Sequence, residues 1–315
     1  MKKTLLIMVL FTLSFISAQN KYVTITMDDL PFTAFTSKTT NLDSLEKFNN
    51  QLITDINNNN IPVTIFVNEN DIIHINETDR RINIYNNLIS NFLVTVGNHT
   101  YNHLNFAQVK QHEFENSIIS GEVITKKLIE PTNKELKYFR FPYNCTCKDS
   151  ISKTLIDSFL VKNNYISTPF TIESSDYVFN LLYVNYLEKN EPDSAKLIAE
   201  EYINFTKKLF EYFEEFTQKE YGRNINHIFL CHGNKLHADY FENLINMLKN
   251  CGYTFISLDE TLKDKVYNQK DYYYYKWGVS WLYRWIKDSS KRKSLMRIEP
   301  EINPEIYKLY EAINK

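Results

Sequence analysis

Short apolar segments rich in β-branched and aromatic residues recur along this chain, and longer stretches with helical periodicity lie between several of them. The short segments predict strands over Tyr22–Met27, Val63–Val67, Phe92–Val96, Tyr138–Phe141, His227–Leu230 and Thr254–Leu258. The longer stretches predict helices over Leu42–Ile56, Ile198–Phe216 and Phe241–Leu248, and Gly252 is expected to stop the last of them. This alternation favours an α/β fold with a mostly parallel sheet, in which functional side chains gather at the carboxyl ends of the strands.

The segment from Lys263 onward differs in composition, because it holds all three tryptophans and a run of four tyrosines. Trp277, Trp281 and Trp285 follow one another at intervals of four residues, which predicts that they lie near one face of a helix. We expect a terminal extension whose aromatic side chains pack on the main domain. A sugar-binding platform and a membrane-surface helix are the alternatives.

The first residues have the features of a signal peptide. Lys2 and Lys3 precede the apolar stretch Thr4–Ile16, and Ser17 and Ala18 offer a cleavage site of small residues. An N-terminal membrane anchor is the alternative, although the stretch is short for a spanning helix. We therefore expect an exported mature protein, periplasmic or extracellular, with no transmembrane segment.

Composition narrows these expectations. The chain has 315 residues, of which 43% are hydrophobic, enough for one large barrel-like domain or two small ones. A net charge of −2 gives no indication of a nucleic-acid partner. Export permits disulfides, but the spacing of the cysteines lacks two C-x-x-C pairs, and we interpret them as free or loosely paired. The cysteines are Cys145, Cys147, Cys231 and Cys251.

Two short motifs near strand ends carry candidate metal ligands. Asp28 and Asp29 end the first predicted strand, and because consecutive residues point in different directions, one can bind a metal while the other moves a proton. His99 and His103 follow the third predicted strand, and on a helical turn both rings would share one face. One carboxylate and two imidazoles leave positions open for water and substrate, as in catalytic zinc sites. An iron site is the alternative, but its acid and first histidine are usually close in sequence.

Three further residues complete the candidate chemistry. Arg140, which precedes Pro142 and Tyr143, can fix a nearby carboxylate and keep it ionised. His232 ends another predicted strand and is a candidate general acid, and Asp176 could pair with it and keep it protonated. The remaining histidines lie in polar or helical contexts, and no functional role is predicted for them: His74, His112, His227 and His237.

In this order, the motifs resemble those of the polysaccharide deacetylases, the NodB-homology domain of carbohydrate esterase family 4. The five motifs are Thr26-Met27-Asp28-Asp29, His99-Thr100-Tyr101-Asn102-His103, Arg140-Phe141-Pro142-Tyr143, Asp176-Tyr177 and Leu230-Cys231-His232. The Asp-Asp-Leu-Pro form of the first motif and the G-x-S-W-L-x-R-W string that ends at Trp285 are similar to an exported sub-branch. Leu30, Met27 and Tyr177 depart from the usual Gly, Phe and Trp, in regions that shape the acetyl pocket and the sugar-contact surface.

The resemblance implies a distorted (β/α) barrel with a C-terminal aromatic helical extension. The implied limits are residues 1–18 for the signal peptide, 19–262 for the NodB-homology domain and 263–315 for the extension. It also implies a hydrolase that removes N- or O-linked acetyl groups from a polysaccharide or oligosaccharide, with one divalent metal ion. Zinc is expected first, and cobalt or another divalent ion is possible.

The family's site residues carry over by motif. Asp29, His99 and His103 would bind the metal, and Asp28, held by Arg140, would be the catalytic base. His232, oriented by Asp176, would be the catalytic acid. The backbone N–H of Tyr143 would stabilise the oxyanion, and Leu230, Tyr143 and Tyr177 would contact the substrate. Two alternatives stay open, a related metal hydrolase acting on a non-sugar amide or ester and a non-catalytic carbohydrate-binding relative.

Overall fold

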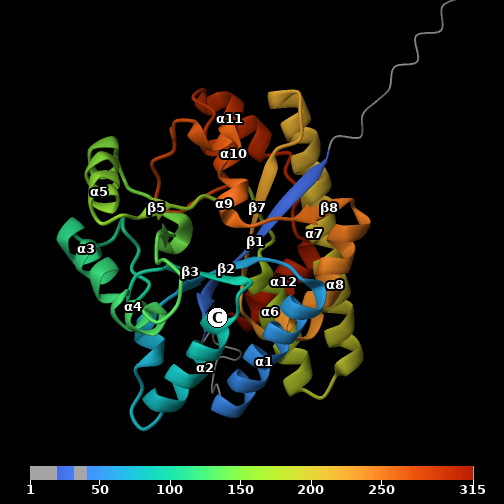
Figure 1. The fold of residues 1–315 in the computed structure, drawn as a ribbon. Coiled ribbons are helices and arrows are strands. Elements are labelled where there is room, and N and C mark those ends of the chain that lie inside the picture. Colours follow the sequence, from blue (N-terminus) through green and yellow to red (C-terminus); the bar gives the residue numbers. More distant parts are fainter. Residues whose placement is uncertain (1–19, 32–40, 315) are drawn as a thin grey trace, which may run out of the picture.

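The computed structural model describes residues 20–31 and 41–314, and its centre is an eight-stranded sheet in which all neighbours run parallel (Figure 1). The strands are β1 (Lys21–Leu30), β2 (Val63–Val67), β3 (Val94–Asn98), β4 (Tyr138–Phe139), β5 (Ile166–Ser167), β6 (Ile172–Glu173), β7 (Asn226–His232) and β8 (Tyr253–Phe255). Their order is β5-β4-β3-β2-β1-β7-β6, with β8 beside the start of β1. The sheet curls into a half-barrel surrounded by helices, which confirms the predicted α/β barrel.

Helices cover the outside of the sheet (Figure 1). They are α1 (Leu42–Asn59), α2 (Thr78–Ser90), α3 (Gln111–Ser120), α4 (Val123–Ile129), α5 (Ser150–Lys162), α6 (Asp176–Glu188), α7 (Pro192–Tyr221), α8 (Lys235–Asn250), α9 (Leu258–Thr261), α10 (Trp281–Arg284), α11 (Ser289–Met296) and α12 (Pro304–Ile313), with the 3₁₀ helices η1 (Glu69–Ile72), η2 (Pro142–Asn144) and η3 (Lys265–Asn268). The three predicted helices are confirmed as α1, α7 and α8. Each extends beyond the apolar pattern because polar side chains form its ends, such as the Asn234 side chain that caps α8.

Strand β1 shows how the sequence orients the barrel. Its apolar residues Val23, Ile25 and Met27 are fully buried, and they alternate with Thr26 and Asp28. Because side chains alternate between the two faces of a strand, the apolar set packs in the core while Thr26 and Asp28 share the other face. The carboxylates of Asp28 and Asp29 lie at the carboxyl end of this strand.

All six predicted strands are present, but β5 and β6 were not predicted, because each is only two residues long. They belong to one extended segment, 166–173, that pairs with β4 at its start and with β7 at its end. This segment contains both edge strands of the sheet, β5 and β6, and therefore connects the two edges across the opening of the half-barrel. Too few residues lie in each strand to show a periodic pattern.

The C-terminal extension packs against this closing segment. The Trp281 N–H donates to the Phe170 carbonyl at 3.0 Å, and the Ser280 hydroxyl donates to the Thr171 carbonyl at 2.7 Å. Helices α10 and α11 lie at one end of the molecule, whereas α12 lies beside α6 (Figure 1). These contacts join the C-terminal segment to the barrel, and the domain limits 19–262 and 263–315 stay a prediction.

The predicted common helix face of the three tryptophans is wrong. Trp281 begins the short helix α10 and Trp285 follows it, and both rings are buried. Trp277 lies in the preceding loop with 54% of its surface exposed. Helix formation starts only at Trp281, because the Ser280 side chain caps that position by accepting from the Leu282 N–H.

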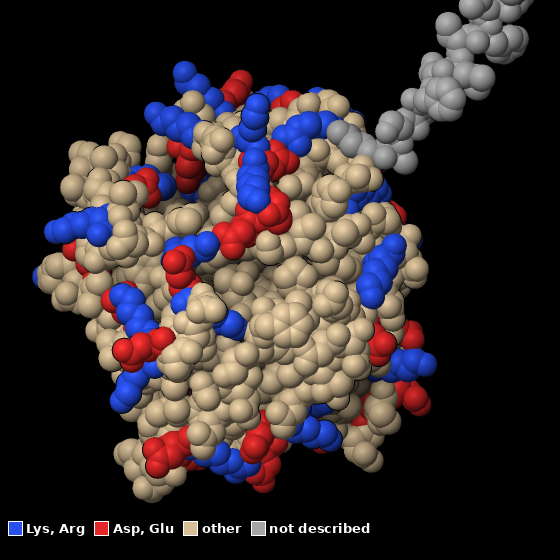
Figure 2. Space-filling view, viewed as in Figure 1, with Lys and Arg blue, Asp and Glu red and all other residues tan. Residues whose placement is uncertain are grey.

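Charge and processing add little to this architecture. On the face shown in Figure 2, Lys and Arg are interspersed with Asp and Glu, and a broad central area carries neither. The predicted signal peptide, 1–18, lies outside the described residues. Within 20–31 and 41–314, no helix is long and apolar enough to cross a membrane. All four cysteines are free thiols.

Candidate active site

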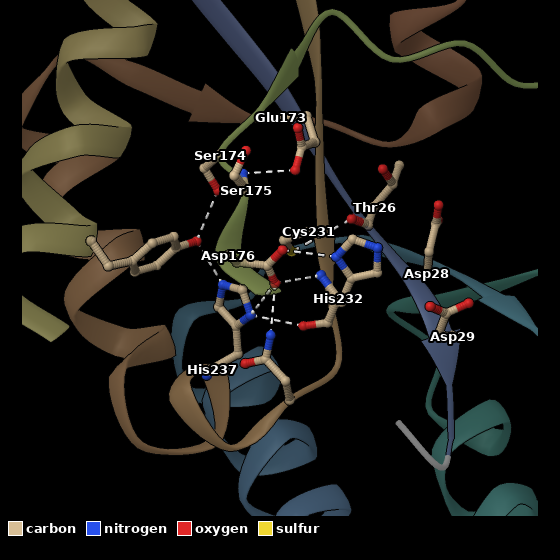
Figure 3. A network of polar contacts seen from close by, with 12 residues as sticks. Thr26, Asp28, Asp29, Glu173, Ser174, Ser175, Asp176, Cys231, His232 and His237 are labelled. Atoms are coloured by element: carbon tan, nitrogen blue, oxygen red, sulfur yellow. Dashed lines mark hydrogen bonds and ion pairs between the residues drawn. The ribbon is translucent and has the colours of Figure 1, made fainter. Parts of the chain in front are cut away.

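The predicted site residues lie at or just beyond the carboxyl ends of β1, β3, β4, β6 and β7. Strands β1 and β7 are in register, so that Asp28 lies opposite His232 (Figure 3). Asp29 follows Asp28 with a left-handed backbone, φ 61°. That turn differs from the sequence prediction, because it brings both carboxylates to the same atom: His99 Nε2 lies 3.9 Å from Asp28 Oδ2 and 3.5 Å from Asp29 Oδ1. A regular strand would have pointed the two side chains to opposite faces.

Arg140 fixes Asp28 from the end of β4. Its Nη1 donates to Asp28 Oδ1 at 2.9 Å and to Thr26 Oγ1 at 2.7 Å, and its Nη2 donates to the Pro169 carbonyl at 3.0 Å. The guanidinium is completely buried and lies over the Phe66 ring, 4.4 Å from the ring centroid. A buried ion pair with this many hydrogen bonds holds the Asp28 carboxylate in one orientation.

Asp29, His99 and His103 form a compact set of metal-ligating atoms. All three ligand atoms lie within 4.8 Å of one another. Asp29 Oδ1 is 3.5 Å from His99 Nε2 and 3.3 Å from His103 Nε2. His99 Nε2 is also 3.9 Å from Asp28 Oδ2, so that the cluster adjoins the carboxylate held by Arg140.

The two histidines come together differently from the prediction of a helical turn. Residues 99–103 form a loop, in which Thr100 and His103 have φ values of 68° and 53°. Asn98 accepts from the Thr100 N–H at 2.7 Å, and Asn68 donates to the His99 carbonyl. Side-chain amides thus stabilise a bend that local helical hydrogen bonds would have excluded.

His99 is prepared as a ligand by its surroundings. Its Nδ1 lies 2.8 Å from the Arg140 carbonyl, which can only accept, so Nδ1 carries the proton and Nε2 faces Asp29. Burial lowers the pKa of His99 to about 3, which keeps the ring neutral. One carboxylate and two imidazoles, one of them buried and neutral, form a donor set that fits a divalent ion such as zinc with open coordination positions.

On the other side of β1, Asp176 and His232 form the predicted pair (Figure 3). Asp176 is buried at the first position of α6 and accepts from His232 Nδ1 at 2.8 Å, from the His232 N–H at 2.9 Å and from Asn234 Nδ2 at 2.7 Å. Burial by itself lowers the pKa of His232, but the charge and hydrogen bond of Asp176 outweigh it and raise that pKa to about 10. Burial likewise disfavours the Asp176 carboxylate, yet His232 holds its pKa well below the usual range.

Sequence reasoning missed His237, for which no role was predicted. Its Nδ1 lies 2.7 Å from the His232 carbonyl and 3.3 Å from Asp176 Oδ2, and its Nε2 lies 2.7 Å from the Tyr202 hydroxyl (Figure 3). The carbonyl requires a proton on Nδ1, so Tyr202 donates to Nε2. The spacing of five residues from His232, across the Asn234 cap, was the available signal.

Glu173 is a second residue beside this pair that carried no predicted role. It accepts from the Ser175 N–H at 2.7 Å. Burial, reinforced by the charge of Asp176, raises the pKa of Glu173 to about 7. The site therefore holds a carboxyl group that titrates near neutral pH next to the His232–Asp176 pair.

The remaining predicted residues lie next to these groups. Tyr143, at φ 56° in η2, packs its ring edge-on against His103 with centroids 4.5 Å apart. As the second residue of a short helical turn, it has an N–H with no acceptor inside the turn. Leu230 is buried two residues before His232, and Tyr177 beside Asp176 is 52% exposed. The contact of these three residues with the substrate stays a prediction.

Comparison with known proteins supports part of this description. Residues 16–155 match the family model described as polysaccharide deacetylase. That region contains the metal-ligand cluster and Arg140 but ends before Asp176 and His232. No curated protein sequence matches the chain.

Three solved structures are reported as examples of structural similarity. The chitin deacetylase of the fungal pathogen Colletotrichum lindemuthianum has a TM-score of 0.50 and 21% identity, over 83% of this chain and 94% of that one. The CE4 family pseudoenzyme of Bacillus anthracis has a TM-score of 0.49 and 14% identity, over 77% of this chain and 66% of that one. The peptidoglycan deacetylase PdaC of Bacillus subtilis has a TM-score of 0.47 and 13% identity, over 79% and 93%.

At these identities the similarity to solved structures concerns the fold. The chain spans about two thirds of the length of the Bacillus anthracis protein. The chain thus contains a region that matches the polysaccharide deacetylase family, on a NodB-type (β/α) barrel like that of a chitin deacetylase.

Proposed function

We propose that this protein is a metal-dependent deacetylase of an acetylated polysaccharide or oligosaccharide, related to the exported sub-branch with the Asp29-Leu30-Pro31 motif. One observation carries the proposal. The metal-ligand cluster, Asp29, His99 and His103, lies beside a carboxylate that Arg140 holds in place, and His232, hydrogen-bonded to Asp176, lies opposite that carboxylate on β7. A hydrolytic site needs this combination of a base and an acid on either side of a polarising centre.

Each residue has a defined part in hydrolysis. A divalent ion, zinc first, would supply Lewis acidity toward the acetyl carbonyl and toward water when it is held by Asp29, His99 and His103. Asp28 accepts a proton from the attacking water, because Arg140 orients its carboxylate beside the candidate metal ligands. The water oxygen bonds to the acetyl carbon.

The second half of the reaction breaks the bond to the sugar. The Tyr143 N–H donates to the oxyanion of the tetrahedral intermediate. His232 donates its proton from Nε2 to the leaving amine or alkoxide, because Nδ1 is engaged by Asp176. With a pKa raised to about 10, His232 is protonated at neutral pH and ready to donate. Acetate and the deacetylated sugar are released, and Leu230 would line the acetyl pocket.

Acetate release tests the proposal directly. We expect the chain without residues 1–18 to release acetate from one of peptidoglycan, chitin-type oligomers, acetylated xylan or a surface polysaccharide, with added zinc or cobalt and not with a chelator. Asp28→Asn should lower the rate by about 10²–10⁴-fold, the usual contribution of a general base. The matched control is Asp193→Asn, an exposed acid in the first turn of α7, which should retain the wild-type rate.

The alternatives give different results in the same assay. Metal bound at one ion per chain with no acetate from any glycan would contradict the deacetylase and favour a non-sugar amide or ester substrate. Oligosaccharide binding without acetate release at any metal loading would favour a binding protein.

We also propose export. Lys2, Lys3, the apolar stretch Thr4–Ile16 and the small residues Ser17 and Ala18 support it. The mature protein should begin at Gln19, which N-terminal sequencing of the secreted or periplasmic fraction would test. Retention of the intact N-terminus in the membrane fraction would instead indicate an anchor.

A further inference from the structure

We infer that the C-terminal extension contributes to substrate binding beside the candidate active site, where the exposed indole of Trp277 stacks on a pyranose ring that neighbours the acetylated one. This inference rests on the proposed function and deepens it. It assigns a role to a part of the chain, residues 263–315, that lies beyond the family match.

Trp277 adjoins the metal-ligand cluster through one intervening ring. Its ring centroid lies 5.3 Å from that of Tyr143 in an edge-to-face arrangement, and Tyr143 lies 4.5 Å from His103 in the same arrangement. The series His103–Tyr143–Trp277 therefore leads outward from the candidate ligands to solvent. A sugar chain with one residue at the metal would place a neighbouring residue along this series.

The backbone on both sides of Trp277 is fixed to the site. The Gly278 N–H donates to the Tyr143 carbonyl at 2.9 Å, and Asn105 Nδ2 donates to the Lys276 carbonyl at 3.2 Å. Gly278 is required for this approach, because a Cβ there would lie 2.2 Å from Asn144 Cβ and 2.4 Å from the Asn144 carbonyl oxygen. The indole is thus presented from a fixed backbone at the loop that supplies the oxyanion N–H.

Arg284 ties the same loop to the extension. Its guanidinium is buried over the Trp281 ring, 4.1 Å from the ring centroid, donates to the Asn144 carbonyl at 2.9 Å and also bonds Thr146 and Asp271. Asn144, like Tyr143 before it, has a positive φ. Such a backbone persists only where its surroundings hold it, and here the extension supplies part of that support.

Exposure separates Trp277 from the other two tryptophans. Trp281 and Trp285 are 8% and 7% exposed and complete the core, whereas Trp277 is 54% exposed and has Lys276 Nζ 5.3 Å from its ring centroid. A rigid aromatic ring with an N–H at its edge suits the C–H face and hydroxyls of a sugar. Beyond His232, the exposed Tyr177 pairs with Tyr310 of α12, so the extension also reaches the other flank of the site.

Substitution of Trp277 tests the inference. With N-acetylchitotetraose and acetylated xylotetraose as probes, Trp277→Ala should raise KM by roughly tenfold, the size expected for loss of a stacking contact. This increase in KM should exceed any increase on 4-nitrophenyl acetate by about the same factor, because that ester has no neighbouring pyranose ring to stack on Trp277. Trp277→Phe should recover most of the affinity. Phe92→Ala is the control, since Phe92 is 80% exposed just before β3, at the end of the sheet opposite the site.

A binding titration separates this inference from the proposed function. Calorimetric titration of either tetrasaccharide should show weaker binding to the double variant Asp28→Asn, Trp277→Ala than to Asp28→Asn alone. Acetate release with an unchanged KM in Trp277→Ala would overturn the stacking role and leave the deacetylase standing. If the wild type releases no acetate from any glycan, the deacetylase fails, and weaker tetrasaccharide binding by Trp277→Ala would still support the stacking role. Equal binding, or none, would overturn it.

Discussion

The metal-ligand cluster and the His232–Asp176 pair lie on either side of β1, and they are held in different ways. Asp29 and His103 are more than a quarter exposed and both have positive φ, Asp29 at the irregular end of β1 and His103 in a loop. Asp176 is fully buried at a helix start and accepts hydrogen bonds from the side chain and backbone of His232 in β7 and from the side chain of Asn234, the residue that caps α8. Backbone torsions therefore set the ligand positions, whereas burial and charge set the protonation of the acid.

The difference has a chemical reason. A divalent ion requires several atoms to converge on one point, which tight loops achieve, and the ion itself compensates for exposed ligands. A general acid requires a shifted pKa, which only a desolvated charge can produce at close range. The two halves should therefore respond differently to substitution.

The largest expected effect belongs to the metal half. His99→Ala removes one ligand of three, and metal affinity should fall by more than the roughly 10–100-fold that loss of an outer-shell partner causes. Acetate release should drop to that of the chelator-treated wild type, with metal content measured by elemental analysis. His74→Ala, which changes an exposed histidine near α2, should bind metal as the wild type does. Full metal loading in His99→Ala would show that the ligand set is wrong.

Asp176→Asn should act on the other half through pH. Asp176 is the main group that raises the pKa of His232, to about 10, so removing its charge lowers that pKa and leaves only the weaker influence of Asp29 and Asp28 to oppose burial. His232 then loses its proton at a lower pH, and the alkaline limb of the pH–rate profile should move to lower pH. At mildly alkaline pH the rate should fall by about 10²-fold, a typical loss of general-acid catalysis.

Metal content and the control variant make this result specific. Asp176→Asn should bind metal normally, because Asp176 lies across β1 from the ligands. Asp239→Asn, an exposed acid on α8, should keep the wild-type profile. An alkaline limb that does not move in Asp176→Asn would exclude His232 as the group that titrates there.

Tyr202→Phe should have a smaller effect, mainly on stability. It removes the hydroxyl that donates to His237 Nε2 and leaves that buried nitrogen without its donor. We expect a loss of about 1–3 kcal/mol in the free energy of unfolding, measured by urea denaturation. Tyr307→Phe, at an exposed position on α12, should cost little. An equal loss of unfolding free energy in both variants would show that the Tyr202–His237 hydrogen bond is not the cause.

The smallest effect should come from Thr100→Gly in the metal loop. Thr100 is a buried β-branched residue at φ 68°, and its hydroxyl has no hydrogen-bond partner within the described part of the chain. Glycine relieves about 1–2 kcal/mol of left-handed strain and so offsets its own entropic cost. Thr95→Gly, at a regular position in β3, should be more destabilising by about 1 kcal/mol. The reverse order would argue against strain at Thr100.

The sequence predicted the frame of the site well. Strand β2 has the predicted limits, Val63–Val67, and Asp28 and His232 lie near the ends of strands that parallel pairing brings together. These predictions succeeded because apolar periodicity reports which face of an element is buried, and parallel strands place their carboxyl ends at one edge.

Other features could not be predicted, since distant contacts create them. In the sequence, His237 shows no sign of a function. Its contacts with Asp176 of α6 and Tyr202 of α7 exist only in the folded protein. Trp277 does not lie on the expected helix face, because the N–H of its neighbour Gly278 donates to the Tyr143 carbonyl. Tyr143 is far away in the sequence, so no local pattern could indicate this contact.

By itself, the sequence determined which candidate residues occur, in which order, and on which strands they lie. The strands could be predicted because they follow from local periodicity. Only the tertiary structure decided the left-handed turns at Asp29 and His103, the raised pKa of His232 and the exposure of Trp277. Each of these depends on which distant groups exclude water or supply a hydrogen bond at that point. No local pattern encodes that information.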